Sequence, residues 1–511
     1  NPPAFTYLLH YLFGIWYGGG AGVVHAFALH PDELYTLARV VAAVLGVAAL
    51  WLLYLTGARL FGRGVGLLAA AIEAVAFLPV FYAHLALNDV PTLAPLTLSL
   101  LGTAGVVRKG RRRDYLLAGV GLGLACATKY TAGIAIVPLA AAVAARYLDR
   151  EPSGGGPVLA GLLLAGAAAL LAFLLANPYA VLDYSSFHGE LVHQSTLSAE
   201  AQGKLGAPGH GGIPYYLWSL TWGLGWAPAL AALGGALTVW RSSPRLGWLL
   251  VPAPLLFLLA MGLQGRYFGR WLMPILPITC LLAAFFAVRM LDVAARLAAP
   301  RRRGRAAVAA LLVAALLAQG VLYSVHAGLV LSRADTRSLT RAWMLAHVPA
   351  GARIVVEPVA PDEWAREVRP GTSTAANPDR WKKYPSLFAR ISASGVLEQT
   401  AARKVGIENY ERTLAPALIG YYLANGYCWV ISGSTQSGRA FADPGAVPLA
   451  IAYYRALAQQ GEVVHRSSPY GRGQGPVAFG FDWSFDYYPL AYRRPGPEMT
   501  VYRLHGGRCG R

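Results

Sequence analysis

Ten long apolar runs are the sequence feature that most constrains the fold. A helix that crosses the hydrocarbon core of a bilayer needs about 20 consecutive, mostly apolar residues. Runs of this kind lie at 34–56, 64–84, 88–107, 114–128, 130–147, 157–176, 217–239, 246–263, 271–290 and 305–331. Of the 511 residues only 14% are charged, against about 25% in ordinary soluble domains. The pattern excludes a disordered chain, a coiled coil and a nucleic-acid-binding module. It predicts a mainly α-helical, polytopic membrane protein with about ten transmembrane helices.

The basic residues predict how these spans are oriented. Alternate loops hold 17 lysines and arginines, whereas the loops between them hold four. The basic loops lie near 59–63, 108–113, 146–150, 241–245 and 289–305. Short loops rich in positive charge stay on the cytoplasmic side of the membrane. We therefore expect a multi-pass protein of the cytoplasmic membrane whose less basic loops, and the region after residue 332, lie outside.

The composition changes near residue 332, which predicts two domains. Residues 1–332 form a transmembrane module. Residues 333–511 contain short apolar pieces separated by polar, Gly-rich and Pro-rich turns, and they predict an extracytoplasmic α/β domain. Cys428 and Cys509 fall in this second domain, where they could pair if the compartment is oxidising. The sequence leaves that pairing open.

Charged residues collect at the predicted outer ends of the spans, where they are costly and often functional. Asp89 lies in an outer turn, and Lys129 is the only charge between two apolar runs. Arg266 and Arg270 flank an aromatic-rich junction, and Arg39 lies near the outer end of the first run. Each has a structural alternative, namely a helix cap for the acid and snorkelling or interfacial anchoring for the cations. An arginine within an apolar run favours an anionic partner such as phosphate.

Two further features of the transmembrane module need an interpretation. The loop at 177–216 is long and carries acids and histidines, including His188, His193 and His210. Their spacing matches no metal-ligand signature, so no metal or other cofactor is predicted, although a divalent ion is compatible with these residue types. Glu73 lies within a predicted span, where we expect it to form a structural hydrogen bond with a neighbouring helix.

An acid, several cations and a long loop at one membrane surface suit the chemistry of a lipid-linked phosphosugar. Cations there would neutralise the charge on a departing phosphate. A carboxylate would remove the proton from an acceptor hydroxyl. The alternative is a multi-pass lipid or polysaccharide transporter or flippase with the same residues in its outer vestibule. That class predicts inverted repeats with helices broken at the midplane, and the sequence contains no such repeat.

Five segments, in order along the chain, resemble motifs of the GT-C glycosyltransferases. The similar families are the protein O-mannosyltransferases (family 39) and the lipid A aminoarabinose transferases. The segments are 1–9 (NPPAFTYLL), 37–41 (LARVV), 84–91 (HLALNDVP), 127–133 (ATKYTAG) and 269–277 (GRWLMPILP). The tail at 492–504 also resembles prokaryotic members with an outer C-terminal domain, so the resemblance extends over essentially the whole chain.

The resemblance implies a GT-C-like fold and an inverting transfer of a sugar from a polyprenyl-phosphate donor. The acceptor would be a protein, lipid or glycan on the outer face, and the other partners would be membrane lipids, with no nucleic acid. The resemblance gives Asp89 a supporting catalytic role and places the lipid phosphate at Lys129 and Arg270. The further implied substrate-binding residues are Tyr130, Arg266, Arg39, His84 and His210.

One departure from the family pattern concerns the principal catalytic acid. In the family this acid, usually an Asp-Glu pair, precedes the "PP" segment, and the printed sequence opens on that segment. We therefore expect a further span and an acidic outer loop upstream of Asn1. Asp32 and Glu33, which follow the segment, are the alternative.

Overall fold

The computed structural model describes two compact units. The described residues are 2–148, 156–199, 205, 211–297, 302–367, 377–386, 390–391, 397–398, 405–480 and 487–510. The first unit, here the helical unit, comprises residues 1–201 and 210–325. The second, here the α/β unit, comprises residues 202–209 and 326–511.

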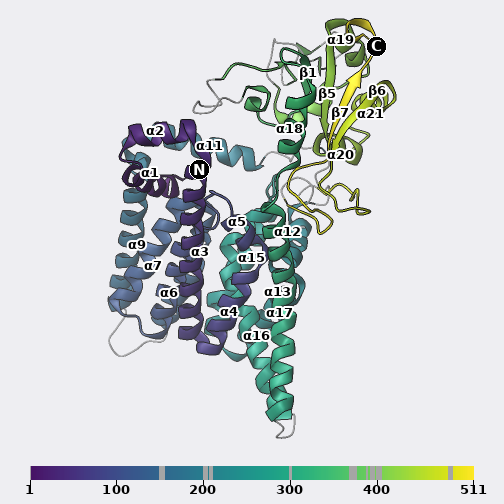
Figure 1. Ribbon diagram of the computed structural model, residues 1–511. Coiled ribbons are helices and arrows are strands. Elements are labelled where there is room, and N and C mark those ends of the chain that lie inside the picture. The colour runs from purple at the N-terminus through teal and green to yellow at the C-terminus, as the bar shows by residue number, and fades with distance from the viewer. Residues whose placement is uncertain are drawn as a thin grey trace. The chain divides into compact units, whose positions relative to one another are not determined.

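The helical unit is a bundle of long apolar helices (Figure 1). Its elements are α3 (Pro31–Phe61), α4 (Arg63–Val75), α5 (Phe77–Ala83), α6 (Leu93–Arg108), α7 (Arg112–Thr128), η1 (Tyr130–Ala135), α8 (Ile136–Leu148), α9 (Gly156–Ala176), α12 (Gly212–Leu220), η2 (Thr221–Gly225), α13 (Trp226–Ser242), α14 (Pro244–Leu250), α15 (Pro252–Gly262), η3 (Gly269–Ile275), α16 (Leu276–Leu297) and α17 (Arg302–Leu331). Every predicted apolar run coincides with a helix or with consecutive helices. The mainly helical membrane fold is therefore confirmed.

The number of spans depends on how bent and short helices are counted. Among the described residues, seven helical segments are long and apolar enough to cross a bilayer, and two bent pairs raise this number to nine. One pair, α4 with α5, bends by 59° and fills the second predicted run. Helices α6 and α7 have only 16 and 17 residues, so these two and the bent pair of α4 with α5 account for the three predicted runs beyond the seven straight spans.

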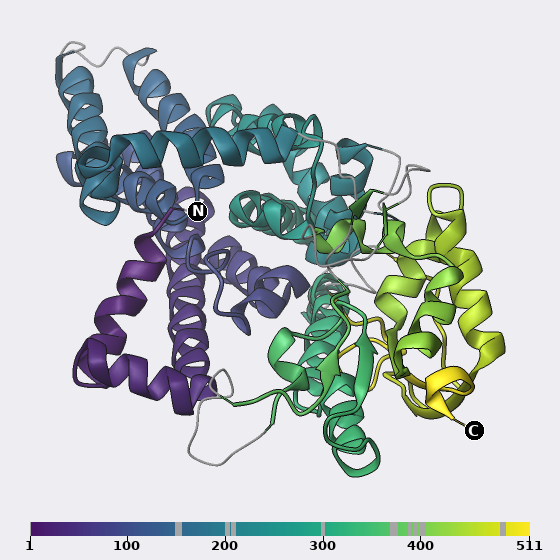
Figure 2. The ribbon, with the colours of Figure 1, turned by 90° about the horizontal axis from the view of Figure 1, so that it is seen from above.

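The second bent pair precedes residue 34, where the first predicted apolar run begins, so the sequence analysis predicted no span there. Helices α1 (Ala4–Trp16) and α2 (Gly20–Leu29) meet at 93°, and Gly18 and Gly19 between them have positive φ. Only glycine adopts such angles without strain. The pair lies across one end of the bundle (Figure 1) and forms an elbow at its margin when seen from above (Figure 2).

The long segment after α9 is also helical over most of its described length. It contains α10 (Tyr179–Leu182) and α11 (Tyr184–Ala199). Like α1 and α2, α11 runs across the end of the bundle (Figures 1 and 2). This end carries the start of α3, the turn before α6 and the end of α7.

Close packing around α7 fixes the position of that end. A Cβ at Gly119 or Gly123 would clash with the backbone carbonyls of Ala165 or Ala169 in α9. Small residues let transmembrane helices approach closely, and van der Waals packing then holds them together. The residue after α7, Lys129, is therefore presented from a rigid support.

The surroundings of Glu73 differ from the prediction that this residue forms a hydrogen bond with a neighbouring helix. Its side chain is buried in α4, but neither carboxylate oxygen has a hydrogen-bond partner in the described part of the chain. The expected bond to a neighbouring helix is therefore wrong for the described residues.

The α/β unit is built on a five-stranded mixed sheet. The strands are β1 (Arg353–Val356), β2 (Lys382–Lys383), β5 (Tyr427–Gly433), β6 (Gly461–Ser467) and β7 (Met499–Leu504), in the order β2-β1-β5-β7-β6. Strands β2, β1 and β5 are parallel, and β7 is antiparallel to both β5 and β6. Strands β3 (Arg390–Ile391) and β4 (Leu397–Glu398) form a separate antiparallel pair. The predicted α/β character of this region is confirmed.

Helices cover both faces of the sheet. They are α18 (Thr336–His347), α19 (Ala417–Asn425), α20 (Ser434–Ala442) and α21 (Pro448–Gln460), with short 3-10 turns η4 (Asp362–Ala365), η6 (Ile407–Thr413) and η7 (Gly507–Cys509). Alternate strand residues face opposite sides. Val355 and Val430 pack with residues of α19 and α21, whereas Ile354 and Ile431 pack with Met344 of α18.

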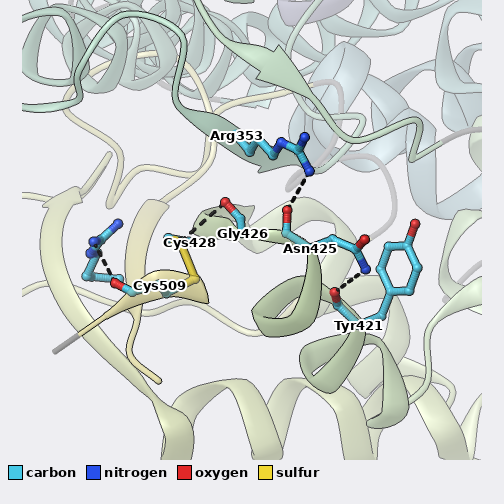
Figure 3. The surroundings of a disulfide bond; sticks show 7 residues. Arg353, Tyr421, Asn425, Gly426, Cys428 and Cys509 are labelled. Atoms are coloured by element: carbon cyan, nitrogen blue, oxygen red, sulfur yellow. Dashed lines mark hydrogen bonds between the residues drawn. A yellow bond between two sulfur atoms is a disulfide. The ribbon is translucent and has the colours of Figure 1, made fainter. Parts of the chain in front are cut away.

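A disulfide joins Cys428 at the start of β5 to Cys509 just after β7 (Figure 3). The two Cα atoms are 5.3 Å apart. The antiparallel pairing of β5 with β7 brings the start of one strand beside the end of the other. The pairing that the sequence left open is therefore present in the fold.

Candidate active site at one end of the bundle

An ion pair between Asp89 and Lys129 forms the centre of the site. Asp89 lies in the turn between α5 and α6, and Lys129 is the extended residue between α7 and η1. The Lys129 ammonium donates to Asp89 Oδ1. The two side chains are 13% and 4% exposed, so the pair is shielded from water and its interaction is strong. Two residues 40 positions apart in the sequence thus meet, a contact that the sequence analysis did not predict.

Neighbouring hydrogen bonds hold these two turns together. Asn88 Nδ2 donates to the carbonyl of Thr128 over 2.8 Å, which links the turn before α6 to the end of α7. Thr92 Oγ1 donates to the carbonyl of Asn88 over 2.6 Å. The backbone on both sides of the ion pair is therefore fixed before any substrate binds.

Arg270 adds a second positive charge near Lys129. It lies at the start of η3, which packs against η1, and its charge acts on the Lys129 ammonium. The guanidinium carbon is 5.2 Å from the centroid of the Phe268 ring, a cation–π distance. Lys129 and Arg270 thus bring two cationic side chains close to one another, and clustered cationic side chains are the groups that bind phosphate and carboxylate.

Tyr130 and Asn177 extend the site toward α9. Tyr130 is half-buried and its side chain is adjacent to that of Asn177. Asn177 is buried, and its Nδ2 finds no acceptor with normal hydrogen-bond geometry among the described residues. Such a donor is costly unless a ligand or water satisfies it. The sequence analysis did not single out Asn177, although its place at the outer end of an apolar run was a usable signal.

An apolar pocket of about 400 Å³ opens next to these residues. Phe5 and Leu8 of α1 and Leu45 and Leu52 of α3 contribute to its lining, as do Pro91 and Thr128. Thr128 directly precedes Lys129, and Pro91 follows Asp89 by two positions. We call this the bundle pocket. It joins a charged site to a surface suited to hydrocarbon.

The structure describes three of the four other predicted site residues. His84 is exposed, and its Nδ1 hydrogen-bonds the carbonyl of Val80 over 2.8 Å. Arg39 is exposed on α3 and forms no hydrogen bond or ion pair with another described residue. Arg266 is half-buried between α15 and η3. His210 lies outside the described residues. The roles of these four residues stay predictions.

The described residues contain no group of three or more His, Cys, Asp or Glu side chains placed to hold a metal ion. Within the long segment after α9, Asp183 Oδ1 instead accepts hydrogen bonds from the Ser185 hydroxyl and the Ser186 backbone amide.

Residues 27–180 match the family model of dolichyl-phosphate-mannose-protein mannosyltransferases. This range contains Asp89, Lys129, Tyr130 and Asn177. No curated protein sequence matches the chain.

Several solved structures are similar to the chain at low identity. ArnT from Cupriavidus metallidurans in the apo state is 13% identical with a TM-score of 0.47, covering 98% of this chain and 87% of that one. The Archaeoglobus fulgidus oligosaccharyltransferase AglB, in complex with an inhibitory peptide and a dolichol-phosphate, is 15% identical with a TM-score of 0.46, covering 95% and 67%. The mycobacterial arabinofuranosyltransferase AftD is 16% identical with a TM-score of 0.41, covering 99% and 35%.

The family match confirms the predicted resemblance to the protein mannosyltransferases of the GT-C group. It also favours a membrane glycosyltransferase over a transporter, because the matched family transfers sugars.

Proposed function

We propose that the protein transfers a sugar from a polyprenyl-phosphate donor to an acceptor at the outer face of the cytoplasmic membrane, with inversion at the anomeric carbon. One observation carries this proposal. The buried pair of Asp89 and Lys129, with Arg270 nearby, lies beside an apolar pocket of about 400 Å³. An anionic headgroup on a long hydrocarbon chain fits both parts at once.

In this proposal the bundle pocket receives the isoprenoid units next to the headgroup. Ligand pockets are mostly apolar and contain a few placed polar groups that fix orientation. The phosphate then lies at Lys129 and Arg270. The Nδ2 of Asn177 is a further donor for the phosphate or the sugar.

The reaction breaks the bond between the anomeric carbon and the phosphate oxygen. The acceptor oxygen attacks the anomeric carbon from the opposite side, and the polyprenyl phosphate leaves with the bonding electrons. Lys129 and Arg270 stabilise the negative charge that grows on this phosphate. Fixed cations are effective here because they need no reorganisation during the reaction.

Asp89 supports the reaction by holding the Lys129 ammonium in place. A carboxylate that is already paired with an ammonium is a weak base. The proton of the acceptor hydroxyl therefore goes to a different carboxylate, and Asp89 acts as a positioning residue.

The proposed orientation places the α/β domain, residues 333–511, outside the cell, and the catalytic module at 1–332 in the membrane. The basic loops support this orientation. The disulfide between Cys428 and Cys509 supports it as well, because such bonds persist in oxidising compartments.

A transfer assay with labelled polyprenyl-phosphate sugar in membranes tests the proposal. We expect Lys129→Ala to lower the transfer rate by about a hundredfold or more, the range found for loss of one electrostatic stabiliser. Asp89→Asn should also lower it. Transfer at the full rate by both variants would exclude the assignment.

A matched control comes from the opposite end of the same bundle. Arg59 and Asp114 form an ion pair of 3.3 Å there, between α3 and α7. Arg59→Ala should retain transfer in proportion to the amount of folded protein. The transporter alternative predicts a different result, namely flux of the lipid-linked sugar into proteoliposomes without any transfer product.

A further inference from the structure

A second pocket, of about 280 Å³, lies in the α/β unit and is not used by the proposed reaction. It lies where β5 ends and β7 begins, with α20 and α21 on its sides. We call it the β5–β7 pocket. It is smaller than the roughly 300–1,000 Å³ typical of drug-sized ligand sites, so its volume suits a single sugar ring.

The floor of this pocket is polar across three adjacent strands. Ser432 of β5 is opposite Thr500 of β7, which is opposite Arg466 of β6. Residues directly opposite one another on neighbouring strands lie on the same face of a sheet. Two hydroxyls and a guanidinium are therefore brought to one face by strand register.

The walls come from two helices. Ser434, Ser437 and Phe441 of α20 are spaced by three and four residues, so they share one helix face. Helix α21 contributes Tyr454 and Arg455. The rings of Phe441 and Tyr454 have centroids 6.2 Å apart and form the aromatic part of the wall.

Glu357, just after β1, locks the lining residues in position. Its carboxylate accepts hydrogen bonds from the Ser432 hydroxyl over 2.9 Å, the Gly433 amide over 2.8 Å and the Tyr454 hydroxyl over 2.8 Å. The Glu357 carboxylate is fully buried. Two of its donors, Ser432 and Gly433, are the last two residues of β5, and the third, Tyr454, belongs to α21. The pocket is therefore preorganised, which reduces the entropy lost on binding.

The rim carries more positive than negative charge. Arg466 is 3.7 Å from Glu498, a long ion pair in which the arginine side chain is 54% exposed. Arg455 is exposed and makes no hydrogen bond or ion pair with another described residue. Among the residues that the structure describes, the guanidinium of Arg455 is thus unpaired, and that of Arg466 is weakly paired. Guanidinium groups bind phosphate and carboxylate in a bidentate manner.

We propose that the β5–β7 pocket binds a monosaccharide-sized ligand that carries a phosphate or carboxylate group. The anion lies between Arg455 and Arg466, and the ring lies against Phe441 and Tyr454. This site is separate from the transferase site, and its test measures binding alone. Failure of one proposal therefore does not imply failure of the other.

Calorimetric titration of the full-length protein in detergent tests the proposal. The probes are glucose 6-phosphate, glucuronate, glucose and inorganic phosphate. We expect the two anionic sugars, or one of them, to bind more tightly than both glucose and inorganic phosphate. The two anionic probes distinguish phosphate from carboxylate recognition.

Three variants complete the design. Arg455→Ala and Arg466→Ala should each weaken binding about tenfold or more, because hydrogen bonds to charged groups are strong. Arg455 is exposed and Arg455→Ala removes no hydrogen bond or ion pair with another described residue, so we expect the variant to fold normally, and its melting temperature checks this. Arg508→Ala is the matched control, an exposed arginine at the opposite end of the same strands.

Three results would overturn the proposal. The first is no binding of either anionic sugar by the unmodified protein up to about 10 mM, well beyond millimolar affinity. The second is equal binding of glucose or inorganic phosphate. The third is binding that is unchanged in both Arg455→Ala and Arg466→Ala.

Discussion

Loss of the disulfide between Cys428 and Cys509 should lower the free energy of unfolding of the α/β unit by about 4 kcal/mol. The bond joins residues 81 positions apart. Closing a loop of that size removes conformational entropy from the unfolded chain worth about 4.5 kcal/mol, and measured losses for native disulfides are about 2–5 kcal/mol. The perturbation is the double substitution Cys428→Ser and Cys509→Ser, which leaves two small polar side chains.

Urea unfolding of the full-length protein, followed by pulse proteolysis of the α/β unit, measures this difference. The double variant should unfold at lower urea with a similar slope, because the folded state is little changed. Reductant should shift the wild-type protein to the same midpoint and leave the double variant unchanged. Cys126→Ala is the control for loss of a cysteine as such, since Cys126 is a free thiol in α7.

Two outcomes would refute the reasoning. Equal midpoints for the wild-type protein and the double variant would show that the bond contributes no stability. Alkylation of Cys428 in the native protein without reductant would show that the bond does not form where the protein resides.

Three smaller predictions concern single side chains. Glu73→Met should leave thermal stability in detergent unchanged or higher, because a buried carboxyl without partners is costly; a loss above about 1 kcal/mol would contradict this. Burial raises the pKa of Glu357 from 4.5 to about 7. The folded state therefore holds a proton that the unfolded state has released, so stability of the α/β unit should fall by up to about 3 kcal/mol from pH 4.5 to 7 and then level off. Glu357→Gln should flatten this dependence in pH-resolved urea titrations; an unchanged curve would assign it to other groups. Asn177→Ala should weaken binding of polyprenyl phosphate about tenfold with little change in melting temperature, and unaltered binding would remove Asn177 from the site.

The transmembrane fold was predictable because lipid imposes a length and a composition on each span. All ten apolar runs are helical for this reason. Helices α1 and α2 were missed because neither is long enough to span and the glycines between them resemble a loop. Helix α11 was missed because its described side chains are exposed apart from the half-buried Phe187, so no clear apolar periodicity distinguishes it from a loop.

The site was predictable only as far as motif order allowed. The sequence predicted that Asp89, Lys129 and Arg270 lie at one membrane surface. The direct ion pair between Asp89 and Lys129 could not be predicted, because it depends on how α6 and α7 pack. The partner of Glu73 was predicted wrongly because hydrogen bonding between helices depends on rotation about their axes. The sequence did not decide whether Cys428 and Cys509 pair. Their disulfide requires β5 to lie beside β7, and these strands are more than 60 residues apart in the sequence.

Turnover of a defined donor by the purified protein tests the central claim most directly. The donor is a polyprenyl-phosphate sugar labelled in the sugar, supplied in proteoliposomes with a membrane extract as the source of acceptor. The account predicts one free polyprenyl phosphate for each labelled acceptor, inverted anomeric configuration in the product, and loss of both signals in Lys129→Ala but not in Arg59→Ala. Transfer that continues unchanged in Lys129→Ala, or retention of the donor's anomeric configuration, would contradict it.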